Sequence, residues 1–224
     1  MWMKSTVRED TGFEPLVRAL GDPVTVERGE TIYQPGTSSA SVYIVHEGRV
    51  KLAYLDESGK KLTLVIVDCG GIFGEMCLVG EQHRRHLATA IEDSILYHVD
   101  RKTFADAIRN EPRYLQLLLE HFADRVREFE ETLEDLAFKD IQARLSRQLL
   151  KLSSEYGVET DEGILIGFQL THKELADMIG SARENTTLAL NRFAREGILD
   201  KSRYRIVIKN EKGLRAKCSC AQQN

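Results

Sequence analysis

A short segment in the last quarter of the chain carries side chains suited to reading a nucleic acid. Arg183, Glu184, Thr187 and Leu188 fall on one face of a predicted helix. Arginine can donate two hydrogen bonds to guanine, glutamate can accept one from the cytosine amino group, and an apolar side chain can touch the thymine methyl. This combination predicts recognition of double-stranded DNA.

Two capping signals predict the helices that must hold these side chains. Thr171 is followed three residues later by Glu174, and Ser181 by Glu184, which is the capping-box spacing at a helix start. Gly180 between them supplies the backbone freedom for a sharp turn. Apolar residues at helical spacing form one inward stripe: Leu175, Ala176, Ile179, Ala189, Leu190 and Phe193. The segment is therefore a predicted helix-turn-helix.

The segment from Ile198 to Ile208 predicts a β-hairpin wing behind the second helix. Its basic side chains Lys201, Arg203 and Arg205 add charge for a phosphate backbone. Expected phosphate contacts, which set register rather than sequence, are Thr171, Lys173, Ser181 and Thr187. A helical hairpin with no nucleic-acid role is the alternative, and the polar outer face disfavours it.

Charge is unevenly distributed along the chain. Residues 1–138 hold 16 Lys/Arg against 24 Asp/Glu, and residues 139–224 hold 15 against 11. An acidic front and a basic back suit a sensor joined to a nucleic-acid reader. No apolar run is long enough for a membrane span, no export signal is seen, and four scattered cysteines do not resemble a secreted disulfide framework. These features predict a cytoplasmic protein with no membrane partner.

Short strands punctuated by glycine are predicted between about Val24 and Arg101. Regular strand spacing favours a jelly-roll-like β-roll, so the fold class is α+β. The glycine-rich stretch from Gly70 to Val79 interrupts the strands, with a short helical turn near Gly74. Its amides could hold an anion, although a tight strand connection is the simpler interpretation.

A long helix is predicted from Arg113 to Phe138. Its apolar residues recur in a strict heptad pattern: Leu115, Leu119, Phe122, Val126, Phe129, Leu133 and Leu136. A narrow seam bordered by carboxylates favours pairing with an identical helix. The sequence therefore predicts a homodimer, with two recognition helices one turn of DNA apart.

The order of these parts resembles the CRP/FNR family of bacterial transcription regulators. The resemblance runs from about Pro23 to Ile208 and rests on three strings: Phe73-Gly-Glu-Met76, Leu136-Ala-Phe-Lys-Asp140 and Ile179-Gly-Ser-Ala-Arg-Glu184. It implies a sensor domain at 1–110, a dimerisation helix at 111–138 and a winged helix-turn-helix domain at 139–224. The implied partners are double-stranded DNA, a second copy of the chain, RNA polymerase and an unknown small-molecule effector.

The resemblance also implies where an effector would bind. Family members that bind cyclic AMP use a Gly-Glu pair, an Arg-Ser-Ala triplet and a Thr-Ser pair on the long helix. The matching positions here are Gly74, Glu75 and Met76, then Arg84, Arg85 and His86, then Phe129 and Glu130. Arg85 and His86 replace the small residues of the triplet. On the long helix, Phe129 cannot donate a hydrogen bond to the purine, and the Glu130 carboxylate would repel the anionic nucleotide. We expect cyclic AMP to bind poorly or not at all.

Other cofactors of the family are weakly matched. The iron–sulfur branch uses an N-terminal cysteine group, and no cysteine precedes Cys69. The haem-binding, carbon-monoxide-sensing members take a Cys and a His ligand from the turn where this chain has Gly74 and Met76, with Cys77 one residue on, so haem is possible but unsupported. Cys218 and Cys220 are interpreted as incidental residues of a frayed tail, with a thiol switch as the alternative.

For DNA, the resemblance assigns base contacts to Arg183 and Glu184. A second arginine often follows four positions after that glutamate, where this chain has Leu188. The predicted function is a homodimeric, effector-controlled regulator that binds a pseudo-palindromic operator. The alternative is a haem, metal or thiol-redox sensing module that acts through protein contacts. The sequence contains no nucleophile–base pair and no phosphate-binding loop that would indicate an enzyme. We therefore assign no catalytic and no metal-binding residue.

Overall fold

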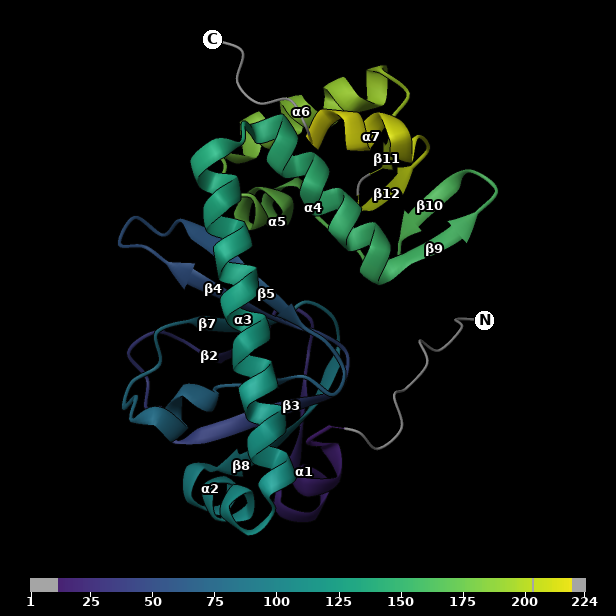
Figure 1. Cartoon of the computed structure of the whole chain (residues 1–224). Helices are drawn as coiled ribbons and strands as arrows, with labels where there is room; N and C mark the ends of the chain where they lie inside the picture. The colour runs from purple at the N-terminus through teal and green to yellow at the C-terminus, as the bar shows by residue number, and fades with distance from the viewer. Residues whose placement is uncertain (1–11, 203, 219–224) are drawn as a thin grey trace. The chain divides into compact units, whose positions relative to one another are not determined.

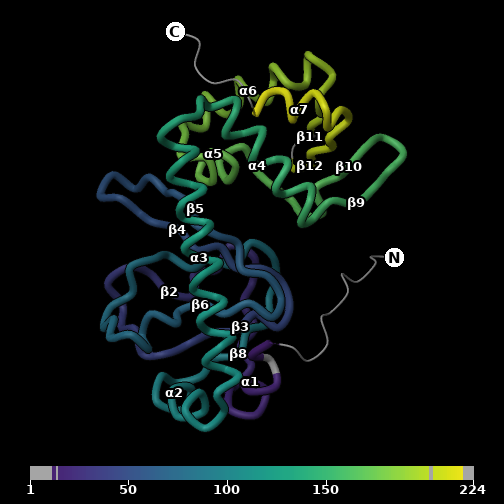
Figure 2. Tube along the Cα trace, in the orientation of Figure 1, coloured from purple at the N-terminus to yellow at the C-terminus, as the bar shows by residue number. Residues whose placement is uncertain are grey.

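The computed structural model describes residues 12–202 and 204–218 (Figure 1). The chain forms two compact units, residues 1–59 with 64–127 and residues 60–63 with 128–224. Most of the strands belong to the first unit, whereas the second unit is mainly helical, as the labels on the Cα trace indicate (Figure 2). None of the helices in the described ranges is long and apolar enough to cross a membrane.

Two four-stranded antiparallel sheets build the first unit, as the strand pattern predicted. The first sheet has the order β1 (Asp22–Val26), β8 (Ser94–Asp100), β3 (Ser41–Glu47) and β6 (Ile72–Phe73). The second has the order β2 (Thr31–Tyr33), β7 (Leu87–Ala90), β4 (Val50–Leu55) and β5 (Lys61–Val67). Strand order departs from chain order in both sheets, as in a jelly-roll-like β-roll.

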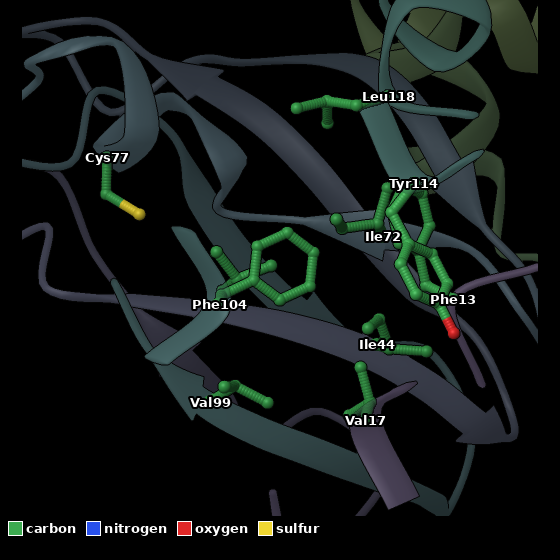
Figure 3. Close-up of a cluster of buried hydrophobic side chains, with 10 residues drawn as sticks. Phe13, Val17, Ile44, Ile72, Cys77, Val99, Phe104, Tyr114 and Leu118 are labelled. Atoms are coloured by element: carbon green, nitrogen blue, oxygen red, sulfur yellow. The ribbon is translucent and has the colours of Figure 1, made fainter. Parts of the chain in front are cut away.

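Buried side chains fill the first unit in two clusters. One contains strand residues of both sheets, including Val45, Leu52, Phe73 and Leu96. The other covers the outer face of the first sheet with helix residues, and Figure 3 shows Phe104 and Tyr114 against Ile44 and Ile72. The helices that contribute are α1 (Glu14–Leu20), α2 (Arg101–Asn110) and α3 (Pro112–Phe138). The sequence did not predict α1 or α2.

The long predicted helix is confirmed as α3, and it has two apolar faces. Tyr114 and Leu118, four residues apart, are buried in the second cluster. The heptad seam is a different face, and six of its seven residues are exposed. Their exposed fractions are Leu115 49%, Leu119 61%, Val126 54%, Phe129 43%, Leu133 68% and Leu136 39%. Only Phe122 of the seam packs partly against the core.

The second unit is a helical domain with a four-stranded sheet of order β11-β12-β10-β9. Its helices are α4 (Ile141–Tyr156), α5 (His172–Met178), α6 (Arg183–Arg195) and α7 (Glu211–Cys218). Its strands are β9 (Gly157–Thr160), β10 (Gly163–Ile166), β11 (Leu199–Ser202) and β12 (Arg205–Ile208). The predicted wing hairpin is confirmed as β11–β12, and it is part of a larger sheet than expected.

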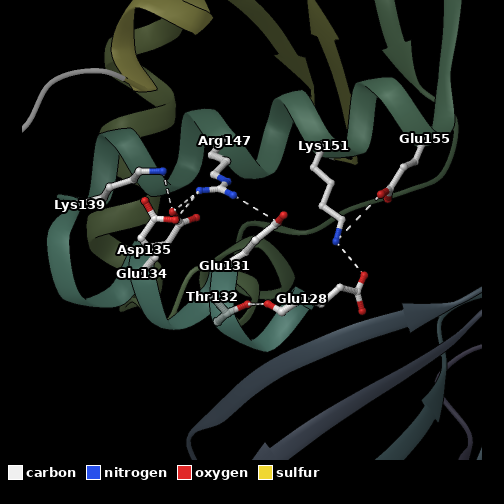
Figure 4. A network of polar contacts seen from close by, with 9 residues as sticks. All are labelled: Glu128, Glu131, Thr132, Glu134, Asp135, Lys139, Arg147, Lys151 and Glu155. Atoms are coloured by element: carbon white, nitrogen blue, oxygen red, sulfur yellow. Dashed lines mark hydrogen bonds and ion pairs between the residues drawn. The ribbon is translucent and has the colours of Figure 1, made fainter. Parts of the chain in front are cut away.

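A network of ion pairs joins the end of α3 to α4 (Figure 4). Asp135 lies 2.8 Å from an Arg147 guanidinium nitrogen and 2.7 Å from Lys139 Nζ, and Lys151 Nζ lies 3.0 Å from Glu128. Asp140 begins α4 by accepting a 2.8 Å hydrogen bond from the Ala143 amide. Carboxylates that border the heptad seam therefore contact α4 of the same chain.

Candidate nucleic-acid interface and effector pocket

The first helix of the helix-turn-helix is capped as the sequence predicted. The Glu174 amide donates to Thr171 Oγ1 at 3.1 Å, and the Thr171 amide donates to the Glu174 carboxylate at 2.7 Å. This reciprocal capping box satisfies two amides that α5 cannot satisfy itself. Gly180 then takes a φ of +59°, the left-handed turn that favours glycine.

The predicted cap of the second helix is wrong. Helix α6 begins at Arg183, its N-cap is Ala182, and no side chain caps it. The Ser181 amide instead donates to the Ala176 carbonyl at 2.9 Å, so Ser181 closes the end of α5. The Ser181 hydroxyl donates to the Ala182 carbonyl oxygen at 3.4 Å and caps no amide of α6.

Helix α6 divides cleanly into a buried and an exposed face. All six residues of the predicted inward stripe across α5 and α6 are buried. Arg183 and Glu184 are exposed at the start of α6, and Leu188 is 65% exposed one turn later. The burial of one face fixes the helix, while the other presents a cation, an anion and an apolar side chain to solvent.

The predicted phosphate contacts differ in their surroundings. Thr187 is half-buried, and its Oγ1 lies 3.0 Å from His172 Nδ1. Lys173 is exposed but pairs with the buried carboxylate of Asp177 at 2.7 Å, so its charge is partly neutralised. Lys201 is half-buried on β11. The wing residue Arg203 lies outside the described residues, and Arg205 is exposed.

Arg84, at the triplet position of the β-roll, is buried inside the fold. The Arg84 side chain donates to the carbonyl oxygens of Gly74 and Ser41 at 2.8 and 2.5 Å. Its guanidinium carbon lies 4.4 Å from the Tyr33 ring centroid, a cation–π distance. Gly74 has a φ of +79°, and a Cβ there would lie 2.6 Å from an Arg84 nitrogen. Arg84 is 6% exposed.

The glutamate next to that glycine is also paired within the unit. Glu75 begins the short 3₁₀ helix η1 (Glu75–Val79), is 7% exposed, and lies 3.4 Å from His121 Nε2 of α3. Burial alone would raise the pKa of Glu75, but the nearby His121 ring and the charge of Arg125 outweigh burial and lower the pKa. The Glu75–His121 pair thus joins η1 to α3.

The remaining predicted effector residues are more accessible. Met76 is 37% exposed, and the Arg85 side chain is 75% exposed with Glu81 3.8 Å away. His86 is half-buried, its ring centroid lies 4.7 Å from that of Tyr54, and burial lowers its pKa. Phe129 and Glu130 are exposed on α3.

The structure therefore brings Gly74, Glu75 and Arg84 together. Their partners Tyr33 and His121 were not predicted, because both residues are distant in the chain and match no motif.

The three cysteines within the described residues do not form a cluster. Cys77 is buried in the core and burial raises its pKa. The frayed-tail interpretation is wrong for Cys218, which ends α7, is half-buried, and has a pKa raised by burial. Cys220 lies outside the described residues. Within residues 12–202 and 204–218, no group of three His, Cys, Asp or Glu side chains could hold a metal ion.

Comparison with known proteins places this architecture in a family. Residues 23–111 match the cyclic nucleotide-binding domain, and residues 143–217 match the Crp-like helix-turn-helix domain. The transcriptional regulator SdrP of Thermus thermophilus is 33% identical over 196 residues, which cover 87% of this chain and 93% of that protein. The chain belongs to the CRP/FNR family of transcription regulators.

Further relatives agree with this placement. The CRP-like cAMP-activated global transcriptional regulator of Mycobacterium tuberculosis is 30% identical over 189 residues, 84% of each chain. A solved structure of a CRP/FNR family transcriptional regulator from Thermus thermophilus has a TM-score of 0.76 and 31% identity, and covers 90% of this chain and 100% of that one. This CRP/FNR protein thus combines a cyclic nucleotide-binding-type β-roll with a DNA-binding helix-turn-helix.

Proposed function

We propose that this CRP/FNR protein is a homodimeric, effector-controlled regulator that reads a pseudo-palindromic DNA site with α6. The observation that carries the proposal is the division of α6 into a fully buried face and an exposed face with Arg183, Glu184 and Leu188. Arg183 and Glu184 suit guanine and cytosine, and Leu188 suits a thymine methyl. Lys201 and Thr171 lie in the same unit as candidate phosphate contacts.

The exposed heptad seam of α3 supports the homodimer. Six apolar side chains at exposed positions would remain in water in a lone chain, and an identical helix would bury them. A dimer also supplies two recognition helices for two half-sites about 34 Å apart.

The test of this proposal combines assembly with DNA selection. Purified protein is expected to sediment as a dimer and to enrich an inverted repeat from a random DNA pool. Leu119→Lys, on the seam, should yield monomers that lose most affinity for the selected site. Glu120→Lys introduces the same side chain one position off the seam and should remain dimeric. Enrichment of no symmetric site, or an unchanged Leu119→Lys dimer, would contradict the proposal.

We propose that cyclic AMP is not the effector, although the family resemblance assigns the effector site to Gly74, Glu75 and Arg84. Two relatives carry names that refer to cyclic AMP, those of Mycobacterium tuberculosis and Thermus thermophilus. Here Arg84 is bound to carbonyl oxygens and Glu75 to His121, so both groups already have partners. Added cyclic AMP is expected to leave affinity for the selected DNA unchanged, and a tenfold gain would contradict this proposal.

A sensor that acts through haem, a metal or a thiol remains the alternative function. The absorbance spectrum and intact mass of natively purified protein distinguish it, because a Soret band or a retained metal would favour it. Three further points stay predictions. They are RNA polymerase as a partner, the division of the chain at residues 110 and 138, and a cytoplasmic location, which follows from a DNA target. We assign no catalytic reaction to the chain.

A further inference from the structure

A histidine bridges the two helices of the helix-turn-helix. His172 is the first residue of α5, and its Nδ1 lies 3.0 Å from Oγ1 of Thr187 on α6. Both side chains are half-buried, so the ring is held in place yet keeps contact with solvent. The hydrogen bond uses Nδ1 and leaves Nε2 for another partner.

The charged groups that act on this ring are both positive and come from two other elements. Lys201 lies on β11 and Arg183 begins α6. Burial, then Lys201, then Arg183 lower the pKa of His172 below its ordinary value of 6.5. The two carboxylates of α5 are engaged elsewhere, Glu174 in the capping box and Asp177 with Lys173. Glu184 is exposed on α6.

Such a cluster has a preferred ligand. The positive charges of Lys201 on β11 and Arg183 on α6 disfavour the imidazolium form of His172 in the free protein. An anion among them reverses the sign of that field, because its negative charge and acceptor oxygens favour the protonated ring. In the proposed complex with DNA, the anion that would meet this face is a phosphate of the DNA backbone.

We propose that His172 is a phosphate contact that takes up a proton when DNA binds, positioned by Thr187 and grouped with Arg183 and Lys201. This inference rests on the proposed DNA-binding function. DNA binding and protonation of His172 are then linked, and each strengthens the other.

The direction of the pH dependence follows from this linkage. The pKa of His172 lies below 6.5 in the free protein, and the proposal requires it to rise in the complex. Affinity for DNA is therefore highest below the free-state pKa and falls as pH rises through the pKa of the complex. For each unit by which DNA raises this pKa, the affinity at the acid limit exceeds that at the alkaline limit by about tenfold per half-site.

The experiment measures affinity for the selected DNA site from about pH 5.5 to about pH 8 at constant salt. Wild-type affinity should fall as pH rises. His172→Gln keeps an amide able to bond Thr187 but cannot titrate, so its affinity should be nearly independent of pH and should match wild type at the alkaline end. His172→Arg carries a permanent charge and should stay tight across the range. His83→Gln, which removes an exposed histidine of the first unit, should follow wild type.

A His172→Gln protein that keeps the wild-type slope would overturn the inference and leave the proposed function intact. A wild-type protein that binds no specific DNA at any pH would instead overturn the proposed function. Titration of the His172 ring by NMR provides a second readout, since a variant with impaired folding cannot affect it. DNA should raise the pKa of the ring, and an unchanged or lowered value would contradict the proposal.

Discussion

Arg84 in the first unit and Arg183 in the second each lie at a position that matches a motif of the family, yet their surroundings are opposite. Arg84 is 6% exposed and bonded to two carbonyl oxygens of its own unit, whereas Arg183 is exposed at the start of α6. The buried arginine stabilises the turn around Gly74, and the exposed one is available to a partner. Both arginines match a family motif, but we expect a structural role for the buried Arg84 and a binding role for the exposed Arg183.

The largest expected effect concerns the buried arginine. Arg84→Met keeps the aliphatic stem but leaves the Gly74 and Ser41 carbonyls without their charged donor, so it should lower the free energy of unfolding by about 3 kcal/mol. Arg85→Met changes the neighbouring exposed arginine and should cost less than about 0.5 kcal/mol. Urea unfolding measures both. Equal losses for the two variants would contradict an internal role for Arg84.

A smaller effect is expected at Glu75. The pKa of Glu75 in the folded state lies below its ordinary value of 4.5. Ionised Glu75 therefore contributes to the free energy of unfolding above about pH 4.5, and this contribution is lost as pH falls through the folded-state pKa. Glu75→Gln should be less stable at neutral pH by about 1 kcal/mol and should show a flatter loss of stability on the acid side. Glu57→Gln, in an exposed turn, should retain the wild-type curve. Unfolding measured between neutral and acid pH separates the two outcomes.

The smallest predicted difference in stability concerns the two predicted helix caps of the second unit. Thr171→Ala removes an observed cap and should destabilise the second unit by about 1 kcal/mol. Ser181→Ala removes a hydroxyl that the sequence pattern predicted as a cap but that bonds no amide of α6, so it should change stability very little. Thermal unfolding of both variants compares them, and a larger cost for Ser181→Ala would show that the start of α6 is misassigned.

Local patterns predicted the elements that depend on local rules. The Thr171 capping box, the turn at Gly180 and the long helix α3 depend on residues a few positions apart, and all were confirmed. The Ser181 cap failed because the same residue closes the preceding helix, which spacing alone does not reveal.

Longer-range features could not be predicted from the sequence. The Glu75–His121 pair joins residues from η1 and α3, and Tyr33 meets Arg84 from a distant strand. The bridge from His172 to Thr187 crosses between two helices and needs their packing angle. No motif encodes these contacts, since tertiary packing of the units creates them.

The most direct test of the account is whether Arg183 specifies a base. Affinity of wild type, Arg183→Ala and Arg195→Ala would be measured for the selected site and for variants at each position of a half-site. The account predicts that Arg183→Ala loses about tenfold or more in discrimination at one position, while Arg195→Ala, at the other end of α6, weakens all sites uniformly if at all. An Arg183→Ala protein with the wild-type base preferences would contradict it.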